Sequence, residues 1–455
     1  MKVHLIAIGG SAMHNLALSL HEKGDVVSGS DDEINEPSKS RLKDAGILPS
    51  EIGWFPNKIT TDIDAIILGM HAREDNPELI KAIEMNLKIY SYPEYIYEAT
   101  KHKTRVVIGG SHGKTTITAM ILHVLKHHKI DADYLVGAQL DGFKTMVKLT
   151  NDSPIAIIEG DEYLASPIDK RPKFHLYKPT IAVLSGIAWD HINVFPTFEN
   201  YLKQFEIFIN LIESKGLLIY CSEDPVLKKL ADKAGYINQI DKQQYALPNH
   251  FIENGVTFIK TKTKEIPLQI FGNHNLMNLS AAKLVCNKLG LSDDLFYEAI
   301  QYFKGAAKRL ELVSKTINFN FYKDFAHSPS KLKATTQAVK HQFPNRYLVA
   351  CMELHTFSSL NETFLSEYNG SMNEADEAIV YFNPLTIAHK KLKEITTEQV
   401  FNYFNTPHLK VFTESVELVN YLKSKSLVNS VLLMMSSGNF DGIDFNHLST
   451  QLNLN

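Results

Sequence analysis

Cysteine is scarce in this sequence: Cys221, Cys286 and Cys351 are the only three among 455 residues. They are odd in number and far apart, so the sequence offers neither a disulfide framework nor the paired spacing of a zinc site. We expect three reduced cysteines in the core, because free cysteine is among the residue types most often buried.

Long apolar runs and an excess of one charge are also missing. No run reaches the ~18 residues that a membrane-spanning helix requires, and the apolar start of the chain enters a glycine turn, as a buried strand would. The 47 basic and 51 acidic side chains give a net charge of −4, which leaves no basic surface for nucleic acid or for an anionic membrane. The sequence therefore predicts a cytoplasmic protein that acts on small molecules and binds neither nucleic acid nor membrane.

What is present is the composition of an ordinary globular protein, with 44% hydrophobic and 22% charged residues. At about 150 residues per domain, the length predicts roughly three domains. Alternating strands and helices indicate an α/β fold with a Rossmann-like domain at 1–100, a central α/β domain that opens with a P-loop-like bend at 101–305 and a second Rossmann-like domain at 306–455. Within the first domain, residues 88–96 are expected to repeat the strand pattern.

The clearest motif is VVIGGSHGKTTITAMILHVL, residues 106–125, in which an apolar strand, a glycine-rich bend and a helix follow one another. The bend is shorter than the generic P-loop, but backbone N–H groups at a helix N-terminus still bind phosphate oxygens. Lys114 would neutralise phosphate charge, while the Thr115 hydroxyl and Glu159, at a later strand end, would suit Mg²⁺. The alternative is a glycine-rich turn with a solvated lysine.

A second glycine turn, residues 9–13, follows the first predicted strand, and Asp31 lies about 20 residues further on, as in dinucleotide-binding domains. The third glycine of that fingerprint is absent. A nucleotide diphosphate without nicotinamide would fit the same helix N-terminus. A tight turn without any ligand is the third possibility.

Six motifs in order resemble those of the Mur ligases, ATP-dependent amide-forming enzymes of peptidoglycan synthesis. They are GSHGKTT (110–116), EGDE (159–162), WDH (189–191), GNHNLMN (272–278), KRLEL (308–312) and KDFAHSP (323–329). The resemblance implies that ATP, with Mg²⁺, phosphorylates a muramoyl carboxylate, and that an amine then attacks the acyl phosphate. It also implies a UDP-sugar on the first domain and the amine substrate on the third.

The same resemblance implies roles for individual residues. Those expected to act in catalysis are Lys114, at the γ-phosphate, with His191, Arg309 and His327. Those expected to bind ATP are Gly110, Ser111, His112, Gly113, Lys114, Thr115, Thr116, Asn275, Asn278, Arg309 and Asp324. One Mg²⁺ is expected at Thr115 and Glu159 and a second at His191. The UDP-sugar is expected at Gly10, Ser11, Ala12, Met13, Asp31, His71 and Asn76.

Two positions depart from the family pattern. Ser328 stands where the second histidine of the His-His-Pro motif is expected, so a role that needs an imidazole there is in doubt. Glu206 stands near the position at which some relatives carry a carbamylated lysine. We hypothesise that an ionised Glu206 supplies the negative charge that carbamylation creates elsewhere.

The resemblance also bears on the amine substrate. The first-domain turn suits the subgroup that uses UDP-N-acetylmuramic acid, and residues 159–179 and 434–443 resemble the member that attaches L-alanyl-γ-D-glutamyl-meso-diaminopimelate in recycling. His355 instead resembles the member that adds L-alanine, which remains the alternative. His191, His327 and His355 are the candidates for deprotonating the amine. We expect a monomer or a weak dimer.

Two other readings make different predictions. A P-loop kinase or ATPase would release phosphate without an amine and would bind no UDP-sugar. A nicotinamide oxidoreductase or a nucleotide-binding regulatory module built on the first turn would be indifferent to Lys114→Ala. Neither accounts for the positions of Arg309, Asp324 and His327.

Overall fold

The computed structural model describes the whole chain except residues 71, 190–193, 234–238, 307–308 and 453–455. Contacts divide it into two compact units, Met1–Ala246 with Asn278–Ala299 and Leu247–Met277 with Ile300–Asn455. Both are α/β with sheets rich in parallel strands, which confirms the expected fold class. The boundaries near residues 100 and 305 stay a prediction.

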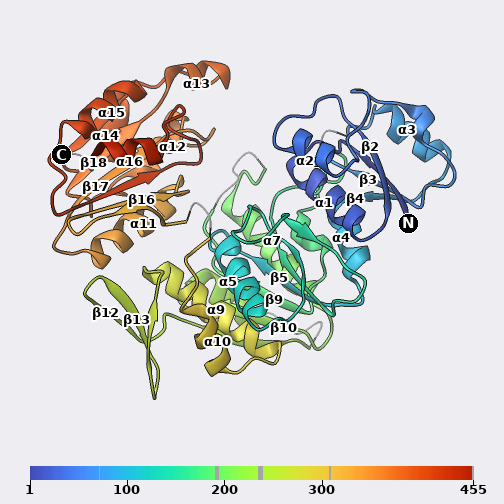
Figure 1. The fold of residues 1–455 in the computed structure, drawn as a ribbon, viewed down its shortest axis with the longest axis horizontal. Helices are drawn as coiled ribbons and strands as arrows, with labels where there is room; N and C mark the ends of the chain where they lie inside the picture. The colour runs from blue at the N-terminus through green and yellow to red at the C-terminus, as the bar shows by residue number, and fades with distance from the viewer. Residues whose placement is uncertain (71, 190–193, 234–238, 307–308, 453–455) are drawn as a thin grey trace. The chain divides into compact units, whose positions relative to one another are not determined.

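The first unit begins with a parallel four-stranded sheet in the order β2-β1-β3-β4, which is drawn in blue in Figure 1. Its strands are β1 (Lys2–Ile6), β2 (Val26–Ser30), β3 (Ala65–Leu68) and β4 (Ile89–Ser91). Its helices are α1 (Ser11–Glu22), α2 (Ser38–Asp44), η1 (Pro56–Lys58), α3 (Pro77–Glu84) and α4 (Tyr92–Thr100). The segment expected as a strand at 88–96 is extended only as far as Ser91. Ser91 and Glu94 form a capping box and Pro93 occupies the first turn, so α4 begins immediately.

The same unit continues into a seven-stranded sheet in the order β11-β10-β9-β5-β8-β6-β7, parallel except for β7. Its strands are β5 (Thr104–Gly109), β6 (Asp133–Leu135), β7 (Val147–Lys148), β8 (Ile155–Glu159), β9 (Ile181–Leu184), β10 (Leu217–Cys221) and β11 (Asp241–Tyr245). Its helices are α5 (Lys114–His127), α6 (Lys173–Leu176), α7 (Phe198–Asn210) and α8 (Pro225–Lys233). Because β5 lies between β8 and β9, the carboxyl ends of these three strands meet at one edge.

The second unit holds an antiparallel sheet of β12 (His250–Glu253), β13 (Val256–Lys260) and β14 (Glu265–Leu268). Its main sheet has the order β15-β16-β20-β17-β18-β19. These strands are β15 (Glu311–Lys315), β16 (Phe319–Asp324), β17 (Tyr347–Glu353), β18 (Glu377–Tyr381), β19 (Leu409–Phe412) and β20 (Ser430–Met435), and β15 alone among them pairs antiparallel. Since β20 lies between β16 and β17, the strand order reverses there, which is where open parallel sheets form ligand crevices.

The helices of the second unit cover the two faces of its main sheet. They are α11 (Pro329–Gln342), α12 (Glu362–Leu365), η2 (Ser366–Tyr368), α13 (Pro384–His389), α14 (Thr397–Phe404), α15 (Ser415–Lys423) and α16 (Phe445–Leu452). Two buried apolar clusters result, one centred on β17, β20 and α14 and the other on the opposite side chains of these strands with α15 and α16. The unit boundary falls within α9 (Asn273–Lys288) and next to the end of α10 (Asp293–Ile300).

The three cysteines are free and buried, as expected. Among the described residues, no helix combines the length and the apolarity that crossing a bilayer requires.

Candidate functional site

The bend between β5 and α5 requires glycine at two positions. Gly110 has φ +120° and Gly113, which caps α5, has φ +80°, a region that side chains other than glycine adopt at a cost. A Cβ atom on Gly113 would overlap the side chain of Asn278, and one on Gly110 would lie 2.9 Å from the Ser185 nitrogen. The bend therefore turns tightly, and the Gly113 cap makes no side-chain hydrogen bond to the first turn of α5.

Lys114 reaches back across this bend. Its Nζ atom donates to the Gly110 carbonyl at 2.8 Å and to Glu162 Oε2 at 2.7 Å. Burial alone would lower the pKa of Lys114, but the charges of Glu162 and Asp161 outweigh it and raise this pKa. The lysine is thus held charged beside the loop that would receive phosphate.

Two residues outside the predicted site, Glu162 and Tyr201, stabilise the loop through hydrogen bonds. Glu162 is 1% exposed, and its Oε1 atom accepts from the Tyr201 hydroxyl at 3.1 Å. The same hydroxyl lies 3.0 Å from Ser111 Oγ, which also accepts from the Ala188 amide at 2.8 Å. Glu162 stands in the EGDE motif and could have been suspected. Tyr201 carries no sequence signal, because its contacts join segments tens of residues apart.

The other predicted loop residues differ in exposure. His112 Nδ1 lies 2.7 Å from the Ser111 carbonyl and is half-buried, whereas Thr116 is buried in the first turn of α5.

Thr115 and Glu159 come together at the edge formed by β5 and β8. The Thr115 hydroxyl donates to Glu159 Oε1 at 2.8 Å, and the Gly137 amide donates to Oε2 at 2.7 Å. Burial raises the pKa of Glu159, although the Gly137 amide and the Lys114 charge oppose the rise. A hydroxyl and a carboxylate are the hard oxygen ligands that suit Mg²⁺. The described residues hold no cluster of three metal-binding side chains, and His191 lies outside them.

Helix α9 carries two of the residues expected to bind ATP, Asn275 and Asn278, one in each unit. Asn278 is buried in the first unit, with its side chain against Gly113. Asn275 is buried in the second unit, where its Nδ2 donates to the Phe271 carbonyl at 2.9 Å.

In the second unit, the loop after β16 gathers the other predicted ATP and catalytic residues. The Arg309 guanidinium lies over the Phe325 ring at 4.7 Å from its centre. Asp324 Oδ2 accepts from the Leu310 amide at 2.7 Å, which ties the Arg309 segment to the end of β16. His327 Nδ1 lies 2.8 Å from the Phe325 carbonyl. The structure therefore brings Arg309, Asp324 and His327 to one end of this strand.

The first glycine turn is organised differently from the second. Gly10 caps α1 with an extended backbone, φ −58° and ψ 149°, and the Gly9 amide donates to Asp31 Oδ2 at 2.7 Å. Asp31 is fully buried at the end of β2. The remaining predicted residues of this turn are Ser11 and Ala12, which are exposed, and Met13, which is buried.

A cavity of about 610 Å³ opens beside this turn. Arg41 crosses it, donating to Asn15 Oδ1 at 3.2 Å and to the Lys144 carbonyl at 2.6 Å. His14 also lines it, with Nε2 3.2 Å from Arg41 Nη1. His14 and Arg41 were missed from the sequence, because they lie outside the glycine motif and meet only through the packing of α1 and α2.

Three further predicted positions lie elsewhere. Asn76 is buried and caps α3, accepting from the Glu78 and Leu79 amides at 3.0 and 3.2 Å. Glu206 lies on α7, where its carboxylate pairs with Lys203 at 2.7 Å in an exposed position. His71 lies outside the described residues.

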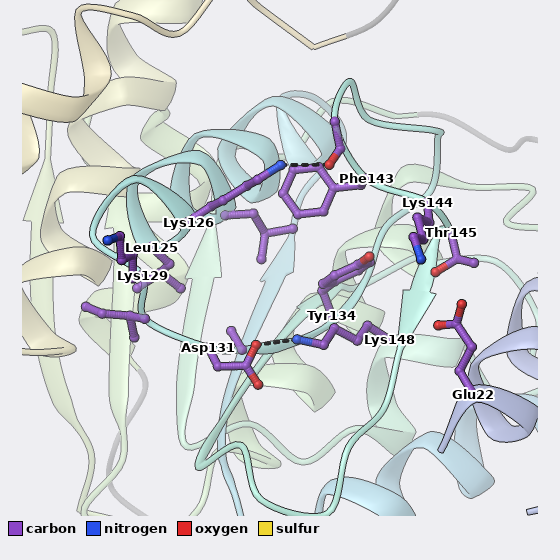
Figure 2. Close-up of a pocket in the computed structure, with 14 residues that line it drawn as sticks. Glu22, Leu125, Lys126, Lys129, Asp131, Tyr134, Phe143, Lys144, Thr145 and Lys148 are labelled. Carbon is purple, nitrogen blue, oxygen red and sulfur yellow. Dashed lines mark hydrogen bonds and ion pairs between the residues drawn. The ribbon is translucent and has the colours of Figure 1, made fainter. Parts of the chain in front are cut away.

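A second cavity, of about 430 Å³, lies at the end of α5 (Figure 2). Four lysines line it, but Lys126 donates to the Gly142 carbonyl and Lys148 pairs with Asp131. It shares Lys144 with the cavity beside the first glycine turn, so one loop borders both. None of the predicted site residues lines this second cavity.

Comparison with known proteins gives the following matches. Residues 2–104 match a model described as the Mur ligase family, catalytic domain, and residues 108–286 match the Mur ligase middle domain. A UDP-N-acetylmuramate–L-alanine ligase of Clostridium kluyveri is 31% identical over 390 residues, covering 83% of this chain and 82% of the relative.

Two solved structures of ligases are also similar to this chain. A UDP-N-acetylmuramate–alanine ligase of Thermotoga maritima has a TM-score of 0.69 at 21% identity, covering 100% of this chain and 98% of that one. A UDP-N-acetylmuramate:L-alanyl-γ-D-glutamyl-meso-diaminopimelate ligase of Neisseria meningitides has a TM-score of 0.58 at 26% identity, covering 67% of this chain and 98% of that one. The first likeness concerns the fold alone.

Proposed function

Because the chain belongs to the Mur ligase family and is thus an ATP-dependent ligase that forms amide bonds, we propose that it joins UDP-N-acetylmuramic acid to a peptide. The carboxylate would come from the muramic acid, and the amine from L-alanyl-γ-D-glutamyl-meso-diaminopimelate. The product would return recycled peptide to peptidoglycan synthesis.

The observation that carries the proposal is the arrangement of Lys114, Thr115 and Glu159 at one sheet edge. Lys114 would contact the γ-phosphate of ATP, beside the N–H groups of α5. The wider ATP site would comprise Gly110, Ser111, His112, Gly113, Thr116, Asn275, Asn278, Arg309 and Asp324. Arg309 would add positive charge to the phosphoryl group, and His327 would lie at the edge of the reacting centre.

The chemistry follows from the poor reactivity of a carboxylate. Transfer of the γ-phosphoryl group to a carboxylate oxygen gives an acyl phosphate and ADP. The amine nitrogen then attacks the acyl carbon, the C–N bond forms, and inorganic phosphate leaves as the C–O bond breaks. Lys114 and Arg309 would stabilise the charge that develops on the transferred group.

Thr115 and Glu159 would hold one Mg²⁺ and His191 a second, and the ions when bound would supply positive charge at the phosphate oxygens. We also propose that Glu206 replaces the carbamylated lysine of some relatives. Replacing Glu206 with Gln tests this: unchanged Mg²⁺ dependence and rate would contradict it.

The UDP-sugar would bind at the first glycine turn. The proposed contacts are Gly10, Ser11, Ala12 and Met13 at the pyrophosphate, Asp31 toward the uridine, and His71 and Asn76 further along the nucleotide. The cavity of about 610 Å³ beside this turn supports the proposal.

The preference for the tripeptide rests on the stretch 159–179. It forms a closed loop in which Arg171 pairs with Asp169 at 2.6 Å and with Glu94 at 2.8 Å, while Lys173 pairs with Asp161 at 2.9 Å. A loop of this kind, Asp-Lys-Arg followed by a lysine, resembles the recycling ligase.

The second candidate is ligation of L-alanine. It is favoured by the printed name of the 31% identical relative and by His355, which resembles the alanine-adding members. Both candidates share the phosphate loop and the sugar nucleotide, and they differ only in the amine.

The deciding experiment is an ATP-dependent ligation assay on UDP-N-acetylmuramic acid, with L-alanine and the tripeptide offered separately. We expect ADP, inorganic phosphate and the UDP-muramoyl-tripeptide in equal amounts, with little turnover of L-alanine. Product from L-alanine alone would replace the first candidate by the second. Phosphate release that needs no amine would contradict both.

We further propose three domains at 1–100, 101–305 and 306–455, which would bind the UDP-sugar, ATP and the amine in turn. The protein would act in the cytoplasm as a monomer or a weak dimer.

A further inference from the structure

Two glutamates are buried in neighbouring strands of the main sheet of the second unit. Glu353 ends β17 and Glu377 begins β18, and each is 4% exposed. In the register of the two strands, Glu353 pairs with Tyr381 and Glu377 with Val349. The two carboxylates therefore lie at opposite edges of the sheet, Glu353 at the carboxyl edge and Glu377 at the amino edge.

Glu377 is neutralised by the protein itself. Its Oε2 atom pairs with Lys425 Nζ at 2.5 Å, and the Tyr421 hydroxyl donates to Oε1. A buried carboxylate is costly unless it has such partners, so Glu377 forms a complete structural ion pair.

Glu353 has no lysine or arginine partner among the residues that the structure describes. Its Oε2 atom accepts from the Ser436 hydroxyl and from the Phe440 amide, the latter at 2.8 Å. Its Oε1 atom lies 3.7 Å from His355 Nδ1, and its charge also acts on the nearby Tyr381. The hydrogen bonds fix the carboxylate from one side, but they bring no full positive charge to it.

Gly438 packs directly against Glu353 and His355, so that only a residue without a side chain fits at this position. A Cβ atom on Gly438 would lie 2.8 Å from Glu353 Oε2 and 2.8 Å from His355 Nδ1. The Gly438 amide donates to Ser436 Oγ at 2.6 Å, which holds the glycine in this position. The cluster lies at the ends of β17 and β20, next to the point where the strand order reverses.

We propose that Glu353 binds the α-ammonium group of the incoming amine and that His355 accepts its proton. This inference rests on the proposed function and applies to the tripeptide and to L-alanine alike. The ligand class is a primary α-ammonium, the cation that Glu353 does not receive from its own chain.

The reaction needs both groups. The α-amine of a peptide has a pKa of about 8, and that of free alanine is higher, so at neutral pH either amine arrives mostly as ammonium, which Glu353 attracts but which has no lone pair for attack. Neutral His355 takes one proton at Nε2, since Nδ1 is the nitrogen nearer Glu353. The freed lone pair forms the C–N bond as the C–O bond of the acyl phosphate breaks, and the leaving phosphate takes the second proton of the nitrogen, which gives the neutral amide.

The test compares Glu353→Gln, His355→Gln and the matched control Glu377→Gln in the full chain. Each is assayed for amine KM, for kcat, and for ATP–ADP exchange with UDP-N-acetylmuramic acid in the absence of amine. Glutamine keeps an acceptor for Ser436 and Phe440, so Glu353→Gln should fold, which thermal unfolding checks.

We expect Glu353→Gln to raise the amine KM about 30-fold or more, and His355→Gln to lower kcat about 100-fold with little change in KM. Exchange without amine should persist in both, and Glu377→Gln should lower the melting temperature but leave the amine KM unchanged. The inference alone is overturned if the wild type ligates while both variants keep their KM and kcat, or if exchange falls in parallel with ligation. If the wild type makes no amide with either amine, the proposed function is overturned as well.

Discussion

Two glycine turns in the first unit each join a buried parallel strand to a helix, but they differ in backbone conformation and in the charge that lies behind them. At the turn after β5, both glycines have positive φ, and a lysine is held by a buried glutamate. At the turn after β1, the capping glycine is extended and a buried aspartate binds the loop amide. The turn after β5 fixes a positive charge, whereas the turn after β1 fixes a negative one. A strand–turn–helix unit thus does not by itself determine which ligand group binds to it. The residues that pack behind the turn determine this.

The largest effect on activity is expected when the positive charge at the turn after β5 is removed. Replacing Lys114 with Met should lower kcat/KM for ATP-dependent ligation about 10³-fold, because one preorganised positive charge on the transferred phosphoryl group is lost. It should also destabilise the fold by about 3 kcal/mol, because Glu162 is left buried without its cation. Steady-state kinetics and urea unfolding measure the two effects.

The double variant Lys114→Met/Glu162→Gln separates them. We expect it to regain most of the stability and none of the activity. Recovery of activity with stability would show that Lys114 has a structural role only.

A smaller effect should distinguish the backbones of the two turns. Gly113→Ala should cost about 2 kcal/mol of stability, because alanine is strained at positive φ and its Cβ atom would overlap Asn278. Gly10→Ala should change stability by less than about 0.5 kcal/mol, since the site is extended and the nearest atoms lie 3.7 to 3.9 Å away. Equal losses in the two variants, measured by urea unfolding, would refute the distinction.

The sequence predicted the two strand–turn–helix units better than it predicted the residues that pack behind the turns. The strand, bend and helix around Lys114 follow from local pattern, and the meeting of Thr115 with Glu159 follows from the alignment of parallel strand ends. Glu162 could have been suspected from its motif, but the position of Tyr201 behind Glu162 and Lys114 could not be predicted, because such a partner depends on tertiary packing between distant segments. The roles of the predicted residues, including Arg309, await the experiments above.

A third prediction concerns the negative charge at the first turn. Asp31→Asn keeps an oxygen that can accept from the Gly9 amide but removes the charge, which should cost about 1 kcal/mol of stability. If Asp31 also contacts the uridine, the KM for the UDP-sugar should rise about tenfold while the KM for ATP stays unchanged. A parallel rise in both KM values would instead indicate a general loosening of the first unit.

The smallest predicted effect is a pH dependence at the same turn. His14 Nε2 faces two donors, Asn15 Nδ2 at 3.1 Å and Arg41 Nη1 at 3.2 Å, so it carries no proton, and Nδ1–H donates to the Gly10 carbonyl at 3.0 Å. Burial lowers the pKa of His14, and the Arg41 charge adds to this lowering against the opposing Gly10 bond. The neutral imidazole therefore accepts at Nε2 from Asn15 and Arg41, and a proton at Nε2 would remove these two contacts.

Since the folded pKa lies below the unfolded value of about 6.5, the unfolded chain gains the proton first as the pH falls. Stability from this group is therefore complete above about pH 7 and declines below it. Between pH 7.5 and 5.5, the melting temperature of the wild type should fall about 2 °C more than that of His14→Gln. His21→Gln, an exposed site on the same helix, is the control and should follow the wild type. If the melting temperature of His14→Gln falls as much as that of the wild type, the imidazole is not held neutral. The contrast between the two turns then rests on Asp31 alone.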